Sequence, residues 1–214
     1  MLSKLPIEVN RKIIIEFLFN DFIKCFKNLF EFKKWQSALN HNYYTFGDLL
    51  YSNFMSALVE NLHPLKIEKN EMILSELDEV FDAFFVCNGQ YDIGYEMNKR
   101  QRFIIRYTKS TVIGGFEVLY DRRSHYNYKA YTVVTGYFIR KKPFREMSSE
   151  YPEFIQNIRR TMLQERYKKL MPIMKRAKAQ DLSKIKKRAD FKQIITMRDF
   201  DEGEIERLVI KEFK

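Results

Sequence analysis

The chain has 214 residues, of which 45% are hydrophobic, 31% charged and 15% aromatic, and its formal net charge is +10. This length suits one sizeable domain with helical appendages or two small domains, and the aromatic content argues against disorder over most of the chain. No apolar stretch approaches the roughly 20 residues that span a bilayer, and no secretory signal pattern opens the sequence. We therefore expect a cytoplasmic protein.

Helical periodicity covers the first part of the chain. Apolar side chains recur every three or four positions over residues 4–32 and again over residues 33–63, and Asn20-Asp21 predicts a break between shorter helices. Thr45 or Ser52 is the predicted N-cap of the last helix in this part. The aromatic side chains that we expect to make core or inter-helix contacts are Phe17, Phe22 and Phe26.

The pattern becomes strand-like after His63-Pro64. Asn88-Gly89 lies between two alternating segments and predicts a β-hairpin, while Gly136 is expected to lie between strands at 129–135 and 137–140. Gly114-Gly115 is expected to open a non-strand segment that reaches about Tyr126. Short strands with tight turns are typical of an antiparallel sandwich or barrel. The remaining predicted strands cover residues 65–68, 72–74, 81–87, 90–95 and 102–107, with a turn at 97–100.

Helical periodicity returns after Pro143. A long helix is predicted to start at Glu150-Tyr151-Pro152-Glu153, which Ser148 or Ser149 precedes, and Pro172 is expected to end or kink it near Met171. Three regions follow from these patterns. They are a helical connector at 1–62, a β-roll with a closing helix at 63–178, and a basic tail at 179–214.

The positive charge lies mainly in the C-terminal part. Residues 141–214 hold 20 of the 38 basic side chains but 12 of the 28 acidic ones. An anionic membrane surface or an acidic protein face is one partner for such a segment, and a solvated helix surface is the plainer interpretation. A nucleic-acid partner is not expected.

The sequence lacks the common signatures of catalysis. The three histidines, His41, His63 and His125, have no metal-like spacing, and neither a nucleophile elbow nor a Walker-type loop is present. Cys25 and Cys87 form no framework and are interpreted as buried free thiols. We predict a protein that is not an enzyme and needs no metal or cofactor.

Several stretches resemble the cyclic-nucleotide-binding domain and C-linker of ion channels of the hyperpolarisation-activated and ether-à-go-go types. The likeness covers about residues 4–178, except an insertion at 33–50, and it implies an α+β fold, an antiparallel jelly-roll with connector helices before it and a lid helix after it. Five stretches carry this resemblance. They are residues 5–13, which begin with Leu5-Pro6-Ile7-Glu8; Asn88-Gly89; residues 112–132; residues 144–147; and Glu150-Tyr151-Pro152-Glu153.

This resemblance makes residues 112–132 a phosphate-binding cassette with unusual ligand positions. The family places a Gly-Glu pair at the ribose and an Arg at the phosphate. Here Gly114 matches the family Gly, Gly115 stands where the Glu belongs, and Ser124 stands where the Arg belongs. Two neighbouring positions also differ from the family: His125 stands where the family has Thr or Ser, and Tyr126 where it has Ala. Glu117 is an alternative group for the ribose contact, and Arg122 or Arg123 for the phosphate contact.

Three functions remain open from the sequence. The first is a regulatory module of a channel or larger complex, at the inner face of a membrane, that does not need cyclic nucleotide. The second is a working cAMP or cGMP sensor that uses Arg122 or Arg123. The third is a DNA-binding regulator of the cyclic-AMP-receptor type, although the segment after Gln180 is short for a helix-turn-helix.

Overall fold

A computed structural model describes residues 19–34, 43–108 and 110–187, with side chains described to residue 183. The chain separates into two compact units, Met1–Arg159 and Arg160–Lys214. Within the described residues, no helix is long and apolar enough to cross a membrane. The predicted region boundaries at 62/63 and 178/179 stay predictions, and the predicted helix contacts of Phe17 and the stretch 5–13 lie outside the described residues.

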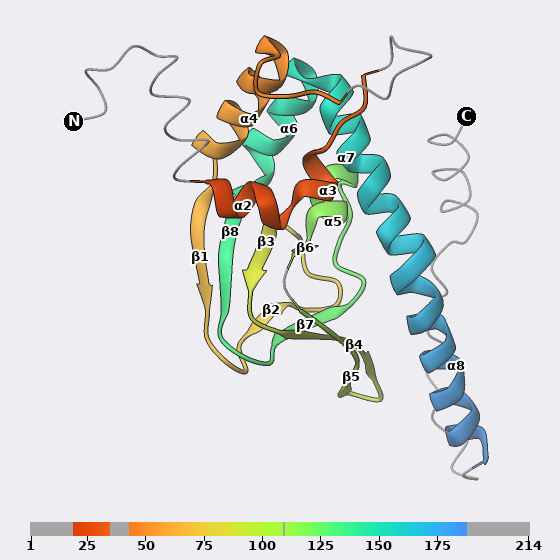
Figure 1. Ribbon diagram of the computed structural model, residues 1–214. Helices are drawn as coiled ribbons and strands as arrows, with labels where there is room; N and C mark the ends of the chain where they lie inside the picture. The colour runs from red at the N-terminus through yellow and green to blue at the C-terminus, as the bar shows by residue number, and fades with distance from the viewer. Residues whose placement is uncertain (1–18, 35–42, 109, 188–214) are drawn as a thin grey trace. The chain divides into compact units, whose positions relative to one another are not determined.

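The first unit is built on two antiparallel four-stranded sheets (Figure 1). One sheet has the order β1-β8-β3-β6 and the other the order β2-β7-β4-β5. This arrangement, with helices before and after it, confirms the predicted α+β fold class with an antiparallel roll. The strands are β1 (His63–Ile67), β2 (Met72–Leu74), β3 (Asp82–Asn88), β4 (Tyr91–Met97), β5 (Arg100–Tyr107), β6 (Thr111–Ile113), β7 (Asn127–Ala130) and β8 (Val134–Arg140).

The hairpin predicted at Asn88-Gly89 is wrong. Strands β3 and β4 on its two sides belong to different sheets, so the dipeptide carries the chain from one sheet to the other. Gly89 has a φ of +98°, and a Cβ there would lie 2.3 Å from the carbonyl oxygen of Val133. Glycine is therefore required by a close backbone crossing, which has the same local signature as a two-residue hairpin.

The tight hairpin of the second sheet lies at Asn98-Lys99, where the sequence predicts a turn. Both residues have positive φ values, 52° and 59°, and Met97 pairs with Arg100 across the turn. Two successive left-handed residues form the turn that matches the twist of paired strands.

Gly136 does not separate two strands, in contrast to the prediction. It lies inside β8, where it pairs with Leu65 of β1 and Val86 of β3. A Cβ at Gly136 would lie 2.0 Å from the carbonyl oxygen of Phe85. The glycine permits close approach of neighbouring backbones, and the break between the last two strands falls at residues 131–133 instead.

Two short helices, α2 (Asn20–Cys25) and α3 (Lys27–Phe30), pack on the first sheet. The ring of Phe22 lies 5.4 Å from that of Phe85 on β3 and 5.4 Å from that of Tyr137 on β8, and Phe26 lies 5.2 Å from Phe85. Figure 1 shows both helices crossing these strands. The core role predicted for Phe22 and Phe26 is confirmed, because both side chains are buried in this aromatic cluster.

Helix α4 (Leu49–Glu60) leads into β1 and confirms the helix predicted there. Its N-cap is Asp48, so neither Thr45 nor Ser52 caps it as predicted. The Asp48 carboxylate instead accepts hydrogen bonds from the Thr45 backbone N–H, at 2.8 Å, and from Lys34, at 2.6 Å. The carboxylate thus organises the turn before the helix rather than the helix end itself.

In the part of the chain that the structure describes, β8 is followed by the α-helices α6 (Lys141–Glu150), α7 (Pro152–Gln164) and α8 (Met171–Lys187). Helix α7 begins at Pro152, within the stretch Glu150–Glu153 predicted as its start, while Ser148 and Ser149 lie inside the preceding helix α6. Phe154 is buried among the rings of Phe32, at 4.8 Å, and Phe54, at 4.9 Å. The aromatic cluster built by the N-terminal segment therefore holds the start of α7 in the first unit.

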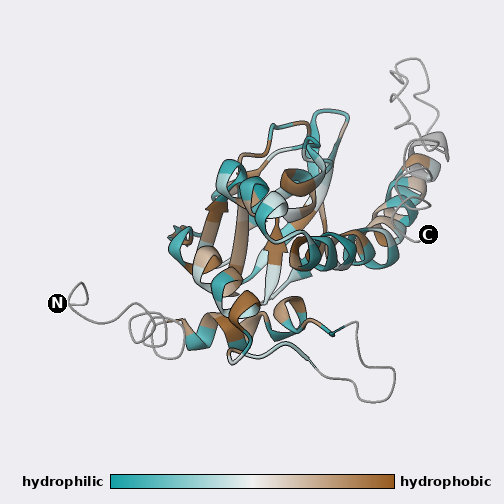
Figure 2. Cartoon of the chain, turned by 90° about the horizontal axis from the view of Figure 1, so that it is seen from above, coloured by the Kyte–Doolittle hydropathy of each residue, from teal (hydrophilic) through white to brown (hydrophobic). Residues whose placement is uncertain are grey.

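The regular α-helix is interrupted just before Met171, near the position where Pro172 is predicted to end or kink it. A π-helical turn, η3 (Glu165–Leu170), separates α7 from α8, and Pro172 is the second residue of α8. A wider turn before a proline accommodates its missing N–H and the ring that would meet the preceding turn. The hydropathy colours in Figure 2 show hydrophilic and hydrophobic residues mixed along this helical stretch.

Candidate functional site

The cassette predicted at residues 112–132 folds as β6, a short helix α5 (Gly115–Tyr120), a loop and β7. The non-strand segment expected after Gly114-Gly115 is therefore confirmed. Gly114 has a φ of +75°, and a Cβ on it would lie 2.7 Å from the Asp82 carbonyl oxygen. The start of β3 thus explains this glycine by packing, without a phosphate.

Ser124, which stands where the family places its phosphate-binding Arg, is completely buried. Its hydroxyl donates a 2.8 Å hydrogen bond to the carbonyl of Tyr126. Its backbone N–H donates to the Asp78 carbonyl at 2.9 Å, and its own carbonyl accepts from Leu77 at 2.7 Å. Ser124 therefore joins the cassette to the β2–β3 loop and presents no cation to a ligand.

Aromatic and apolar side chains fill the surroundings of α5. Tyr126, in the family's Ala position, is 6% exposed, and Phe116 is buried and stacks on Tyr120 at 4.7 Å. Gly115 and Glu117 are also buried, and Glu117 already interacts with other groups of the protein. The predicted ribose-side positions thus belong to the packed interior.

The candidate phosphate ligands lie at the edge of this interior. The Arg123 side chain is 65% exposed, and its Nη2 lies 3.7 Å from a carboxylate oxygen of Glu79, itself 62% exposed. Arg122 is half-buried and already has interactions, and the ring of His125 lies edge-on to that of Tyr126 at 6.4 Å. The structure therefore places Arg123 in a solvated ion pair with the β2–β3 loop.

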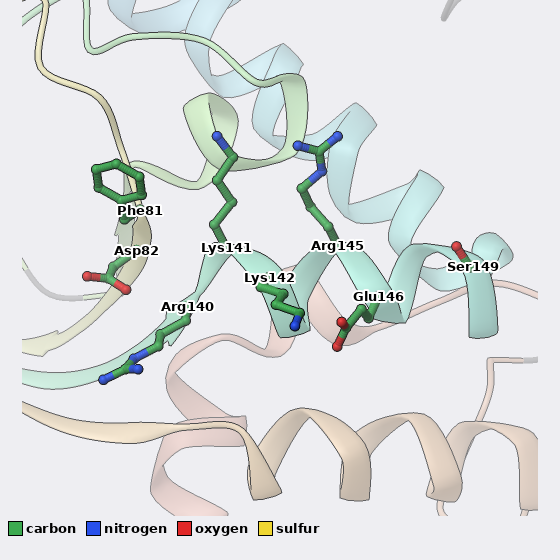
Figure 3. A pocket seen from close by; sticks show the side chains of 8 residues that line it. All are labelled: Phe81, Asp82, Arg140, Lys141, Lys142, Arg145, Glu146 and Ser149. Carbon is green, nitrogen blue, oxygen red and sulfur yellow. The ribbon is translucent and has the colours of Figure 1, made fainter.

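A different place in the first unit is hollow. A pocket of about 900 Å³ lies where β8 runs into α6, beside the start of β3 (Figure 3). It contains none of the cassette residues predicted from the sequence. The run Arg140-Lys141-Lys142 is visible in the sequence, but only the fold brings the β3 residues to it. The pocket is lined by Phe81, Asp82, Arg140, Lys141, Lys142, Arg145, Glu146 and Ser149.

Ion pairs with Asp121 hold one side of this pocket. Lys141 Nζ lies 2.5 Å from Asp121 Oδ1, and Arg145 Nη1 lies 3.5 Å from Oδ2. The hydrogen bond from Lys141, aided by Arg145, holds the pKa of the Asp121 carboxyl below its ordinary value. On the other side, burial raises the pKa of Asp82, while the charges of Arg140 and His63 oppose that rise.

The two cysteines are free thiols, as predicted, but they are half-buried instead of buried. Burial raises the pKa of Cys87 to about 12, and the neighbouring Cys25 thiol adds to this rise. The thiol of Cys87 on β3 therefore lies against Cys25 on α2 and stays protonated at neutral pH. Among the described residues, no group of three or more His, Cys, Asp or Glu side chains gathers into a metal site.

No family model matches the chain, and no curated protein matches it. Solved structures that are similar include the regulatory domain of Toxoplasma gondii PKA with cAMP, at 10% identity and a TM-score of 0.47 over 60% of this chain and 44% of that one. A regulatory subunit of a cAMP-independent protein kinase A from Trypanosoma brucei is 18% identical, with a TM-score of 0.49 over 73% and 48% of the two chains. The cAMP-bound PfPKA-R is 15% identical, with a TM-score of 0.42 over 49% and 39%. The chain spans less than half the length of each of these structures.

Proposed function

We propose that this chain is a non-enzymatic regulatory module of the cyclic-nucleotide-binding type whose cassette is occupied by its own side chains. It would act through protein contacts, without needing cAMP or cGMP. The observation that carries the proposal is the burial of Ser124 and Tyr126 at the two positions that would have to receive the phosphate.

The order of the elements supports the domain type. Helices precede an antiparallel roll, the short helix α5 precedes the last two strands β7 and β8, and helices α6 and α7 follow. This is the order that the resemblance to channel cyclic-nucleotide-binding domains implies. The attachment of this roll to a channel pore, with residues 1–62 as a C-linker, belongs to the same proposal.

The energetics of the cassette support independence from ligand. A phosphate without its cationic partner forfeits a charge-assisted hydrogen bond of about 1.5–3 kcal/mol, which is about tenfold to over a hundredfold in affinity. Arg123 would have to leave Glu79 to supply that bond, and Tyr126 would have to leave the packed interior. Displacing a buried aromatic side chain costs several kcal/mol more, so both terms act against binding.

The N-terminal helices support a role in transmission. Phe22 and Phe26 contact Phe85 of β3, and Phe22 also contacts Tyr137 of β8. A displacement of this N-terminal segment would therefore act on the sheet through direct side-chain contacts. A partner that holds these helices would therefore also bias the roll. In the proposal, that partner is a neighbouring subunit or the remainder of a larger assembly.

Isothermal titration of the full chain with cAMP and with cGMP tests this function. We expect no heat of binding up to millimolar nucleotide, and circular dichroism of the same sample checks that the protein is folded. An Arg123→Ala variant serves as the matched comparison, since a sensor that uses Arg123 would lose binding in it. Micromolar binding to the unaltered chain that disappears in this variant would replace the proposal with the sensor function.

A further inference from the structure

The pocket at the β8–α6 junction is held in place by the backbone of the roll. Asp82 and Arg140 face each other in register across β3 and β8, and the Lys141 N–H donates a 2.6 Å hydrogen bond to the Phe81 carbonyl. These contacts fix the end of the strand and the first turn of α6. A ligand that binds here would therefore not have to order the backbone, which lowers the entropic cost of binding.

The cations of this pocket diverge. Figure 3 shows Lys141 and Arg145 extending toward α5, whereas Lys142 leaves α6 on another side and Arg140 projects from the strand end. Asp121 offsets part of the charge of Lys141 and Arg145. Lys142 is exposed and, within the part of the chain that the structure describes, has neither an ion pair nor a hydrogen bond.

Divergent charges and size together argue against a single small anion. A phosphate or sulfate is best held by donors that converge on it, and a pocket of about 900 Å³ is large enough for a drug-sized ligand. The carboxylates of Asp82 and Glu146 in the lining can accept hydrogen bonds from the N–H groups of a peptide backbone, and a polyphosphate has no such donors.

The pocket also offers apolar surface at its rim. The side chain of Phe81 is a large hydrophobic group that is 61% exposed, next to the cations of the strand–helix junction. An exposed aromatic ring beside basic groups suits a ligand that carries both apolar and acidic side chains. Acidic peptide segments have this combination, together with backbone N–H groups for the two carboxylates.

We propose that this pocket binds an extended acidic peptide segment of a partner protein. Its carboxylates contact Arg140, Lys142 and Arg145, and an apolar side chain covers the ring of Phe81. None of the lining residues belongs to the cassette, although Asp121 of the cassette pairs with Lys141 and Arg145 of the pocket. The inference rests on the lining residues and not on whether cyclic nucleotide binds.

The test measures binding of a short fluorescein-labelled peptide of Asp and Glu around a central Leu to the full chain by fluorescence anisotropy. A peptide with Asn and Gln in place of the acids is the control probe. We expect saturable binding of the acidic peptide that weakens with rising salt, and no binding of the control. Equal binding of both peptides, or no binding of either, would overturn the proposal.

Matched variants place the binding at this pocket. Lys142→Glu is expected to lower the affinity for the acidic peptide about five- to tenfold, and Phe81→Ser about threefold. Lys69→Glu makes the same charge change at an exposed position in the turn after β1, at the opposite end of the strand from the pocket, and should have little effect. If Lys142→Glu and Lys69→Glu weaken binding equally, general electrostatic attraction is the cause and the proposal fails.

Two further arms separate the alternatives. Phosphatidylserine vesicles that bind with the same dependence on Lys142, and displace the peptide, would assign the site to a membrane surface and overturn the peptide proposal. Repeating the peptide titration in millimolar cAMP separates the peptide-binding proposal from the proposal that the cassette needs no nucleotide. Nucleotide binding with peptide affinity retained would refute only the function proposed for the cassette.

Discussion

The hydroxyl of Ser124 donates a 2.8 Å hydrogen bond to the carbonyl of Tyr126, and both residues are buried. This contact ties together the two positions at which a cyclic-nucleotide-binding cassette would present an Arg and a small residue. A buried hydrogen bond between two protein groups contributes to stability. To reach a ligand, the Ser124 hydroxyl would have to break this bond. In the function proposed above, Ser124 and Tyr126 stabilise the roll and do not bind a ligand, and the following measurements test this role.

Tyr126→Ala should destabilise the protein by about 3–5 kcal/mol, because it removes a buried aromatic side chain and leaves a cavity. Urea unfolding followed by circular dichroism measures this loss. Arg123→Ala, directly before Ser124 in the chain, is the control and should change the unfolding free energy by about 0.5 kcal/mol or less, since its ion pair is solvated. Equal losses for the two variants would show that Tyr126 is not a core residue.

Gly136→Ala should prevent stable folding or cost more than about 3 kcal/mol, because the new Cβ would lie 2.0 Å from the Phe85 carbonyl oxygen in the middle of the sheet. Gly47→Ala is the matched substitution. Its Cβ would be 3.5 Å from the nearest atom, Thr45 Oγ1, which is an ordinary contact. Thermal unfolding of both variants provides the comparison, and a stable Gly136→Ala protein would contradict the pairing of β8 with β3.

Phe22→Ala should cost about 3–5 kcal/mol, because Phe22 is buried against the rings of Phe85 and Tyr137. Leu49→Ala, at a helix position that is 74% exposed, should stay within about 0.5 kcal/mol. Hydrogen exchange adds a local readout. Fast exchange of α2 amides alone, with β3 amides still slow and the global stability unchanged, would contradict the predicted loss.

The stability of the protein should fall as the pH rises from about 9 toward 12, in part because of Cys87. Its pKa is about 12 in the folded state, against an ordinary value of 9.0, so the unfolded chain loses this proton first. The favourable contribution is complete below pH 9 and is lost as the pH rises through this window. Burial also raises the pKa of Tyr51, to about 12, and that of Tyr91, so the same trend has more than one source.

A Cys87→Ala variant isolates the part due to the thiol. Unfolding free energies of the unaltered chain and the variant are measured by urea titration at pH 7, 9 and 10.5. We expect the difference between the two proteins to shift in favour of the variant as the pH rises. A constant difference across this range would show that the Cys87 thiol titrates at the same pH in the folded and unfolded states.

The succession of elements could be predicted from the sequence alone. Alternation between His63 and Arg140 marks strands, and three-to-four-residue periodicity on both sides marks helices, because each pattern follows from local backbone geometry. The core roles of Phe22 and Phe26 could also be predicted, since large apolar side chains at helical spacing are expected to pack against another element. The place of the cassette in the sequence, at residues 112–132, could be predicted as well.

Only the tertiary structure decided which strands pair and where the chain is hollow. Asn88-Gly89 predicts a hairpin and Gly136 a break between strands, yet Asn88-Gly89 connects the two sheets and Gly136 lies inside β8. Each glycine is required because the backbone of a segment distant in the sequence passes close to it. The burial of Ser124 depends on the β2–β3 loop, and the β8–α6 pocket depends on bringing Phe81 and Asp82 beside Arg140. Such contacts join residues that are distant along the chain, and local residue preferences hold no information about them.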